Sequence, residues 1–200
     1  MKDLDSLVSF LIDVEKLKQT YRYSTCPKVA DSSAEHSWKL AFIASAFSDE
    51  VPGINMTHVF EMCLVHDLGE YVTGDVDAYL IHLGEVTKEK KHEMELKAME
   101  GFRTIGSFGE KIYDLWDEFE KQKTPEAKYS KALDKMEVLL HMLYRGVEHD
   151  SSPSFTTTYA DSAVKNVPEL KPFLRNIKER MKIEYEKADF EWKPEYDAFP

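Results

Sequence analysis

The chain has 200 residues, of which 42% are hydrophobic and 12% aromatic, and this is enough apolar material for a folded core and excludes a disordered chain. Its 26 basic and 37 acidic residues give a formal net charge of −11, so its surface repels a nucleic acid polymer and an anionic membrane. A small anionic substrate is still compatible with this charge if a metal ion or an arginine supplies a local positive centre.

The cysteines and the first residues of the chain indicate the cellular compartment of the protein. Cys26 and Cys63 are the only cysteines in the sequence, and two cysteines outside a CxxC pair do not form a disulfide framework. The start, MKDLDSLVSF, has acidic residues where a signal peptide would be basic. The longest apolar stretch, AFIASAF, is far shorter than the roughly 20 residues of a membrane helix. We therefore expect a cytoplasmic protein with no membrane partner.

The first part of the chain shows helical periodicity. Apolar residues at three- and four-residue steps predict an amphipathic helix over about 3–20. Ser32 and Glu35 have the spacing of a capping box, which predicts a second helix that runs to about residue 48. Asn55 or Thr57 is expected to cap a third helix that ends near residue 70.

Helical patterns resume after the segment YVTGDVDAYLIHLGE, which has no helical period and is predicted to be a loop. Thr87 suits an N-cap, and so does Thr124, which Pro125 follows at a first helical position. The helices predicted here cover about 88–102, 109–122, 124–149, 156–165 and 168–187. We expect the aromatic tail to pack on the surface or on a partner. The predicted fold class is all-α, in one domain over 1–200 with its core at about 3–150 and C-terminal helices and a tail at about 151–200.

Three separate stretches carry side chains that bind divalent metals. His36 lies in the first turn of its predicted helix, His66 and Asp67 lie near the end of an apolar helix, and Asp134 lies within a long one. Because adjacent helical residues point about 100° apart, His66 and Asp67 can approach one ion from two sides of a ridge. Imidazoles and carboxylates suit Mn, Co, Fe, Ni or Zn, and four such ligands leave positions for water and substrate, as hydrolysis requires.

Each of these residues also has a structural explanation. A histidine such as His36 is, alone, more often a hydrogen-bonded helix residue, and Asp134 could be a solvated position between two lysines. His66 and Asp67 are different, because burying them without a partner among apolar neighbours would be costly. The complete set therefore favours a metal site.

Three further residues could serve a hydrolytic site. Glu70 lies four residues after His66 and shares its helix face, where a carboxylate can take or return the proton of a water. Asp75 could reach the same water, or could form an Asx turn after Gly74. Arg22 offers a forked donor that matches a phosphate, although a surface salt bridge is its alternative role.

At these residues the chain resembles a known family. The strings SAEHSWKLA, VHDLGEYVTGD and KALDKME are similar to those of HD-domain phosphohydrolases, in particular the branch of the bacterial 5'-deoxynucleotidases and their eukaryotic HD-domain-containing relatives. The resemblance covers about residues 3–150. It implies an HD-domain helical bundle, often a homodimer, in which a metal-bound water releases phosphate from nucleoside 5'-monophosphates with the support of metals such as Co or Mn.

The resemblance also implies roles for individual residues. The implied metal ligands are His36, His66, Asp67 and Asp134. Glu70 matches the residue that transfers the proton of the attacking water, and Asp75 matches a second catalytic carboxylate. Some relatives hold a second ion near the positions of Glu70, Asp75 and Val76.

The chain departs from the pattern beside the phosphate-binding arginine, which Arg22 matches. In the bacterial enzymes a tryptophan follows this arginine, lies against the sugar and favours deoxyribose. Here Tyr23 follows it. The resemblance therefore implies no deoxyribose preference for this chain, although Tyr23 could still stack on a sugar or a base.

Two other functions stay open beside the hydrolysis of a small nucleotide. HD proteins also act on triphosphates, cyclic nucleotides and alarmones, but the sequence shows no lysine- and arginine-rich signal for a triphosphate. The second alternative is a non-catalytic regulatory module that binds a metal and a nucleotide. Glu70 and Asp75 argue against such a module, because binding alone does not need them.

Overall fold

The computed structural model describes residues 4–197, and within this range the chain folds into helices and forms no β-strand. The longer helices are α1 (Leu4–Asp13), α2 (Ser33–Ala46), α3 (Met56–Val65), α6 (Lys88–Phe102), α7 (Ser107–Lys121), α8 (Pro125–Arg145) and α11 (Lys171–Lys187). The short ones are α4 (Glu70–Thr73), α5 (Ala78–His82), α9 (Pro153–Thr156), α10 (Asp161–Val164) and α12 (Pro194–Asp197). Short 3₁₀ turns add η1 (Val14–Gln19), η2 (Pro27–Val29), η3 (Arg103–Ile105), η4 (Val147–His149) and η5 (Pro168–Leu170). The predicted all-α class is confirmed.

Side-chain caps begin the helices where the sequence predicts them. Ser32 and Glu35 make the reciprocal bonds of a capping box at the start of α2. Asn55 accepts the first-turn bond of α3, and Thr87 and Thr124 do the same for α6 and α8. These caps are local interactions, so the helix starts could be located from the sequence.

Three segments differ from the prediction. The first helix keeps α geometry only to Asp13 and continues to Gln19 as a 3₁₀ helix. The segment predicted to be a loop contains α4 and α5, and the helix predicted over 156–165 is the pair α9 and α10. Helices of four or five residues are too short to show a helical period. Gly74, with a φ of 75°, ends α4 after one turn.

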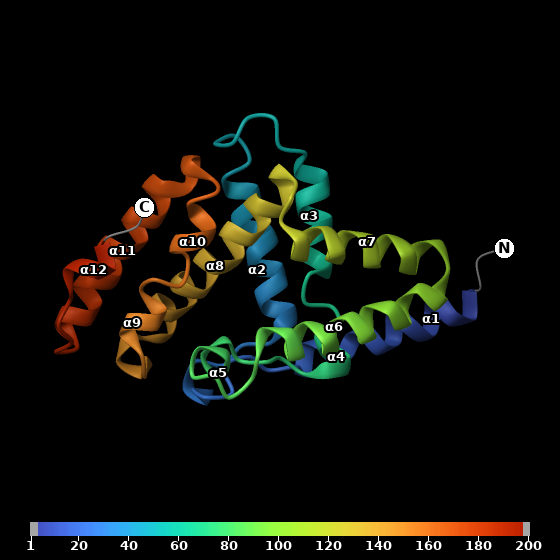
Figure 1. Cartoon of the computed structure of the whole chain (residues 1–200), viewed down its shortest axis with the longest axis horizontal. Helices are drawn as coiled ribbons and strands as arrows, with labels where there is room; N and C mark the ends of the chain where they lie inside the picture. The colour runs from blue at the N-terminus through green and yellow to red at the C-terminus, as the bar shows by residue number, and fades with distance from the viewer. Residues whose placement is uncertain (1–3, 198–200) are drawn as a thin grey trace.

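Helix α8 is the centre of the fold and packs against α2, α3, α7, α10 and α11. Figure 1 shows it crossing the middle of the molecule, with α1 towards one end and α11 and α12 at the other. Its Leu133 and Leu139 share the main hydrophobic cluster with Leu40 of α2 and Leu174 of α11. The C-terminal helices therefore cover the same core as the N-terminal ones. Among the described helices, none combines the length and the apolar character that a membrane crossing needs.

The aromatic tail packs on the protein's own surface. The Trp192 ring lies 6.0 Å from the Tyr185 ring of α11 and 5.4 Å from that of Tyr196. The buried Lys178 ammonium donates to the Tyr196 carbonyl at 2.7 Å and pairs with Asp161 at 2.7 Å. Up to residue 197, the tail is therefore held by aromatic contacts and by a hydrogen bond from the buried Lys178 ammonium.

Candidate metal centre

The four side chains predicted as metal ligands lie side by side. His36 Nε2 is 3.2 Å from His66 Nε2, 3.2 Å from Asp134 Oδ1 and 3.7 Å from Asp67 Oδ2. His66 Nε2 is 3.1 Å from Asp67 Oδ2. The ligand atoms of His36, His66 and Asp67 all lie within 4.8 Å of one another. His36, His66 and Asp67 therefore form one group of potential ligands, and Asp134 adjoins this group through its contact with His36.

Local structure explains how these side chains meet. His36 lies on the buried face of the first turn of α2, where the capping box sets the start of the helix. Helix α3 ends at Val65, and His66 and Asp67 lie in the turn that follows it. Asp134 lies on α8, which packs against both α2 and α3. The contact of these three helices brings the four residues together.

Hydrogen bonds orient both imidazoles. His36 Nδ1 lies 2.7 Å from Glu137 Oε2, and His66 Nδ1 lies 3.0 Å from the Cys63 carbonyl oxygen. Because both acceptors require a proton on Nδ1, each imidazole in its neutral form presents the lone pair of its Nε2 to a cation. Glu137 was not predicted as a site residue. Its position one turn after Asp134 on the same helix face is the signal that could have found it.

The charges around His36 favour a cation. Burial and the charge of Arg22 lower the pKa of His36, but Glu137 and Asp134 act more strongly in the other direction and raise it to about 9. In the absence of a metal, a proton on this imidazole therefore supplies the positive charge that the carboxylates demand.

The two predicted carboxylate ligands stay ionised despite their burial. Burial raises the pKa of Asp67, but His66 and His36 together outweigh this effect and hold that pKa well below its usual range. Burial likewise acts on Asp134, and Lys135 and His36 lower its pKa well below the usual value. An ionised carboxylate is the form that binds a metal, so this donor set fits a divalent ion.

Glu70 and Asp75 lie beside the cluster. Glu70 begins α4, is 2% exposed, and accepts a 2.6 Å hydrogen bond from the Ser33 hydroxyl. Burial and the nearby charges of Asp67 and Asp75 raise the pKa of Glu70 well above its usual value. Burial also raises the pKa of Asp75 to about 6. Both carboxyls line a pocket that reaches the predicted ligands, so both can exchange a proton with a water there.

Arg22 and Tyr23 line the same pocket. The Arg22 guanidinium is buried, and its Nη1 lies 3.6 Å from both Asp31 Oδ2 and Glu137 Oε2. Arg22 is therefore not part of a surface salt bridge. Tyr23 stacks on His141 with ring centroids 5.2 Å apart. Asp31, Glu137 and His141 also bring ligand atoms within 4.8 Å of one another, but the arginine already supplies their positive charge.

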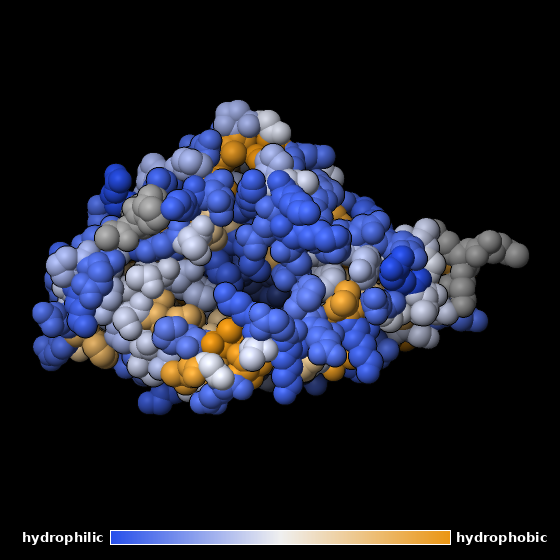
Figure 2. Space-filling model, viewed as in Figure 1, coloured by the Kyte–Doolittle hydropathy of each residue, from blue (hydrophilic) through white to orange (hydrophobic). Residues whose placement is uncertain are grey.

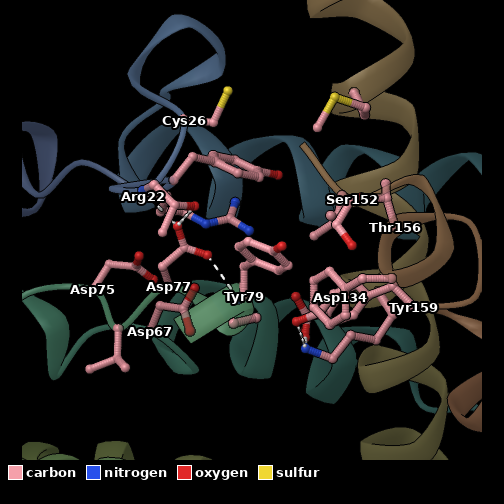
Figure 3. A pocket seen from close by; sticks show the side chains of 18 of the residues that line it. Arg22, Cys26, Asp67, Asp75, Asp77, Tyr79, Asp134, Ser152, Thr156 and Tyr159 are labelled. Atoms are coloured by element: carbon pink, nitrogen blue, oxygen red, sulfur yellow. Dashed lines mark hydrogen bonds and ion pairs between the residues drawn. The ribbon is translucent and has the colours of Figure 1, made fainter. Parts of the chain in front are cut away.

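The pocket lies between the segments around α4 and α5 and the segments around α8 and α9. Figure 2 shows a hollow near the middle of the face, bordered mostly by hydrophilic residues. In Figure 3, one side carries Arg22, Asp67, Asp75 and Asp77, and the other carries Asp134, Ser152, Thr156 and Tyr159.

Three lysines that were not predicted as site residues also line the pocket. They are Lys91 of α6 and Lys131 and Lys135 of α8. The Lys131 and Lys135 ammonium groups lie 3.6 and 3.4 Å from Asp134. Lys131 and Lys135 lie one turn apart on α8, and Lys91 lies in the charged run EKKHEME, which the sequence most simply indicates to be a solvated helix face. The sequence therefore does not show that the three lysines share one pocket. The expectation of a single phosphate, which depended on the lack of a lysine- and arginine-rich signal, loses that support.

Comparison with known protein families and sequences gives a consistent result. A family model of the HD domain matches residues 14–178. The 5'-deoxynucleotidase HDDC2 of Xenopus laevis is 33% identical over 144 residues, which cover 69% of this chain and 68% of that protein. The human 5'-deoxynucleotidase HDDC2 is 31% identical over 153 residues, or 72% of this chain and 71% of that protein. The 5'-deoxynucleotidase hdd1 of Schizosaccharomyces pombe is 32% identical over 147 residues, 68% of this chain and 71% of that protein.

Solved structures share the fold at lower sequence identity. A protein described as a "Predicted metal-dependent phosphohydrolase" from Magnetospirillum magnetotacticum superposes with a TM-score of 0.70 and 22% identity, over 94% of this chain and 93% of that chain. A conserved hypothetical protein from Pyrococcus furiosus gives a TM-score of 0.71 with 21% identity, over 86% of this chain and 99% of that chain. These likenesses concern the helical architecture alone.

Proposed function

The chain belongs to the HD domain family, and we propose that it is a metal-dependent phosphohydrolase that releases phosphate from nucleoside 5'-monophosphates. In this proposal His36, His66, Asp67 and Asp134 hold the metal. The observation that carries it is the close contact of the His36 and His66 Nε2 atoms with two ionised carboxylates, at a pocket that His66, Asp67 and Asp134 line and behind which His36 is buried. The substrate class comes from the relatives, which are 5'-deoxynucleotidases.

The residues around the proposed ion can carry the hydrolysis. A bound divalent cation lowers the pKa of a water and neutralises phosphate oxygens. Glu70 takes the proton of the attacking water, because a cation close by lowers the raised pKa of this carboxyl. Asp75 assists, and the proton passes to the 5' oxygen as its bond to phosphorus breaks. Arg22 faces the phosphoryl oxygens, so the products are inorganic phosphate and the nucleoside alcohol.

The nature of the ion is part of the proposal. The mixed nitrogen and oxygen donors suit Mn, Co, Fe, Ni or Zn. Glu70 and Asp75 are the residues that a second ion would use, as the resemblance to the family implies. The metal stoichiometry of the purified protein distinguishes one ion from two.

The test combines metal content with a substrate panel. Protein stripped by a chelator should release no phosphate, and reloading with Mn or Co should restore release from nucleoside 5'-monophosphates. Asp67→Ala should lose both the metal and turnover. Asp49→Ala is the matched control, since Asp49 is exposed and lies outside the pocket. Phosphate release by metal-free Asp67→Ala would contradict the proposal.

The same panel decides between the alternatives. Triphosphates, cyclic nucleotides and alarmones belong in it, because Lys91, Lys131 and Lys135 supply positive charge that additional phosphates could use. If the protein prefers one of these substrates, the proposed metal centre stands and the proposed substrate class is replaced. Nucleotide binding without turnover at any metal would favour a regulatory module.

We also propose a homodimer in the cytoplasm. Four exposed apolar side chains of α1 support self-association, namely Leu4, Val8, Leu11 and Ile12. Light scattering of the purified protein measures its oligomeric state, and cell fractionation locates it.

A further inference from the structure

Three aromatic rings line the pocket beyond the proposed metal ligands. They belong to Tyr79 of α5, Phe155 of α9 and Tyr159, which follows α9. Phe155 is central, with its ring centroid 5.6 Å from that of Tyr79 and 5.1 Å from that of Tyr159. All three are half-buried. Within the described chain, Tyr79 and Phe155 are not members of the hydrophobic clusters, so the core does not need these two rings.

This aromatic wall, defined as Tyr79, Phe155 and Tyr159, begins close to the proposed metal ligands. The Lys135 ammonium lies 3.4 Å from Asp134 Oδ2 and donates a 2.7 Å hydrogen bond to the Tyr159 hydroxyl. One lysine therefore joins a proposed metal ligand to the Tyr159 edge of the aromatic wall. A nucleotide whose phosphate lies at the metal ligands can therefore place its base at the aromatic wall.

A buried carboxylate ties the aromatic wall to the segment that carries the proposed phosphate-binding arginine. Asp77 is 7% exposed. Its Oδ2 accepts hydrogen bonds from the Thr25 backbone and hydroxyl at 3.0 and 2.6 Å, and its Oδ1 accepts one from the Tyr79 backbone at 2.9 Å. Figure 3 shows Tyr79 between Arg22 on one side and Tyr159 on the other. Asp77 therefore fixes the position of Tyr79 relative to the segment that carries Arg22.

We propose that the aromatic wall is the nucleobase subsite, with Phe155 as its stacking surface. This inference rests on the proposed function, which places the phosphate at the metal ligands. Tyr23 is less suited to the task because its face stacks on His141 at an interplanar angle of 14°. The rings around Phe155, which include His82 at 4.7 Å, are tilted against it by 38° to 54°. Every base offers a π face, so aromatic stacking tolerates all of them. The subsite therefore separates nucleotides from sugar phosphates without a base, and does not select one base.

The experiment compares deoxyadenosine 5'-monophosphate with 2-deoxyribose 5-phosphate, which has the same phosphate ester and no base. Phe155→Leu keeps an apolar side chain and removes the π face. It should raise KM for the nucleotide about tenfold or more, the range of one base–aromatic stack, with kcat little changed. Its kcat/KM for the sugar phosphate should equal that of the wild type.

Two variants control for other effects of the substitution. Phe155→Tyr keeps the π face and should keep the KM of the wild type. Phe42→Leu makes the same exchange at a ring that is 65% exposed on α2, outside the pocket. It should leave KM and kcat unchanged for both substrates. The proposal is overturned if Phe155→Leu lowers kcat/KM equally for both substrates, or if the wild type turns over both substrates equally well.

A binding measurement separates this inference from the proposed function. If neither compound is hydrolysed, the proposed function fails, and titration of the metal-free protein with deoxyadenosine then decides the subsite. Binding by the wild type and by Phe42→Leu, with clearly weaker binding by Phe155→Leu, supports it. No binding by the wild type, or equal binding by all three proteins, overturns it.

Discussion

His36 Nδ1 donates a 2.7 Å hydrogen bond to Glu137 Oε2, and this contact leaves His36 Nε2 facing His66 Nε2 at 3.2 Å. Glu137 is completely buried. Its other oxygen lies 2.9 Å from the Lys39 ammonium, and Arg22 Nη1 lies 3.6 Å from the oxygen that His36 uses. One carboxylate therefore orients a proposed metal ligand and faces the proposed phosphate-binding arginine.

Truncation of this carboxylate should weaken metal binding. Glu137→Ala removes the acceptor that holds the proton on His36 Nδ1, so we expect metal affinity to fall about 10- to 100-fold. Glu137→Gln keeps an acceptor oxygen and should lose less metal affinity than Glu137→Ala. Calorimetric titration of the stripped protein with Mn or Co measures both variants. The exposed Glu100→Ala is the control. A Glu137→Ala protein with the metal affinity of the control would show that the hydrogen bond does not orient the ligand.

Replacement of the arginine by lysine should separate metal binding from catalysis. Arg22→Lys keeps a positive charge between Asp31 and Glu137 but loses the forked donor that matches a phosphate. We expect kcat/KM for a nucleoside monophosphate to fall about tenfold or more, with unchanged metal content. Steady-state kinetics and metal analysis of the same preparation measure the two effects. Wild-type kinetics would remove Arg22 from the proposed mechanism.

Alkaline pH should destabilise the protein through Tyr185. This tyrosine is 1% exposed and donates a hydrogen bond to Asp150. Burial and the Asp150 charge raise the pKa of Tyr185 well above its usual value. The stabilisation is complete below the unfolded pKa of about 10. Above it, the unfolded chain binds fewer protons than the folded one, so the free energy of unfolding falls by about 1.4 kcal/mol per pH unit from this residue.

Denaturant unfolding between about pH 9 and pH 11 tests this dependence. Tyr185→Phe removes the ionisable group, so its stability should decline less steeply with pH than that of the wild type. Tyr144→Phe is the matched control, because the Tyr144 side chain is 81% exposed. Parallel slopes for the wild type and Tyr185→Phe would show that the buried hydroxyl does not produce the effect.

The helix starts could be predicted from the local sequence, and the short helices could not. Ser32, Asn55 and Thr124 each bond a backbone group within three residues, so the residues that start these helices are neighbours in the chain. The helices α4, α5, α9 and α10 have at most five residues each, which is less than two helical turns. Their own sequences carry no periodic signal, and their conformation depends on what they pack against.

The sequence by itself determined that the chain is helical and which donor side chains it offers to a metal, because helical periodicity and the chemistry of His36, His66, Asp67 and Asp134 are properties of the residues. Only the tertiary structure decided that these four side chains meet. It also decided that Glu137 orients His36, and that lysines and aromatic rings from separate helices line one pocket. The physical reason is that distances between residues far apart in the chain depend on how α2, α3 and α8 pack against one another, and a pattern within a single helix does not contain this information.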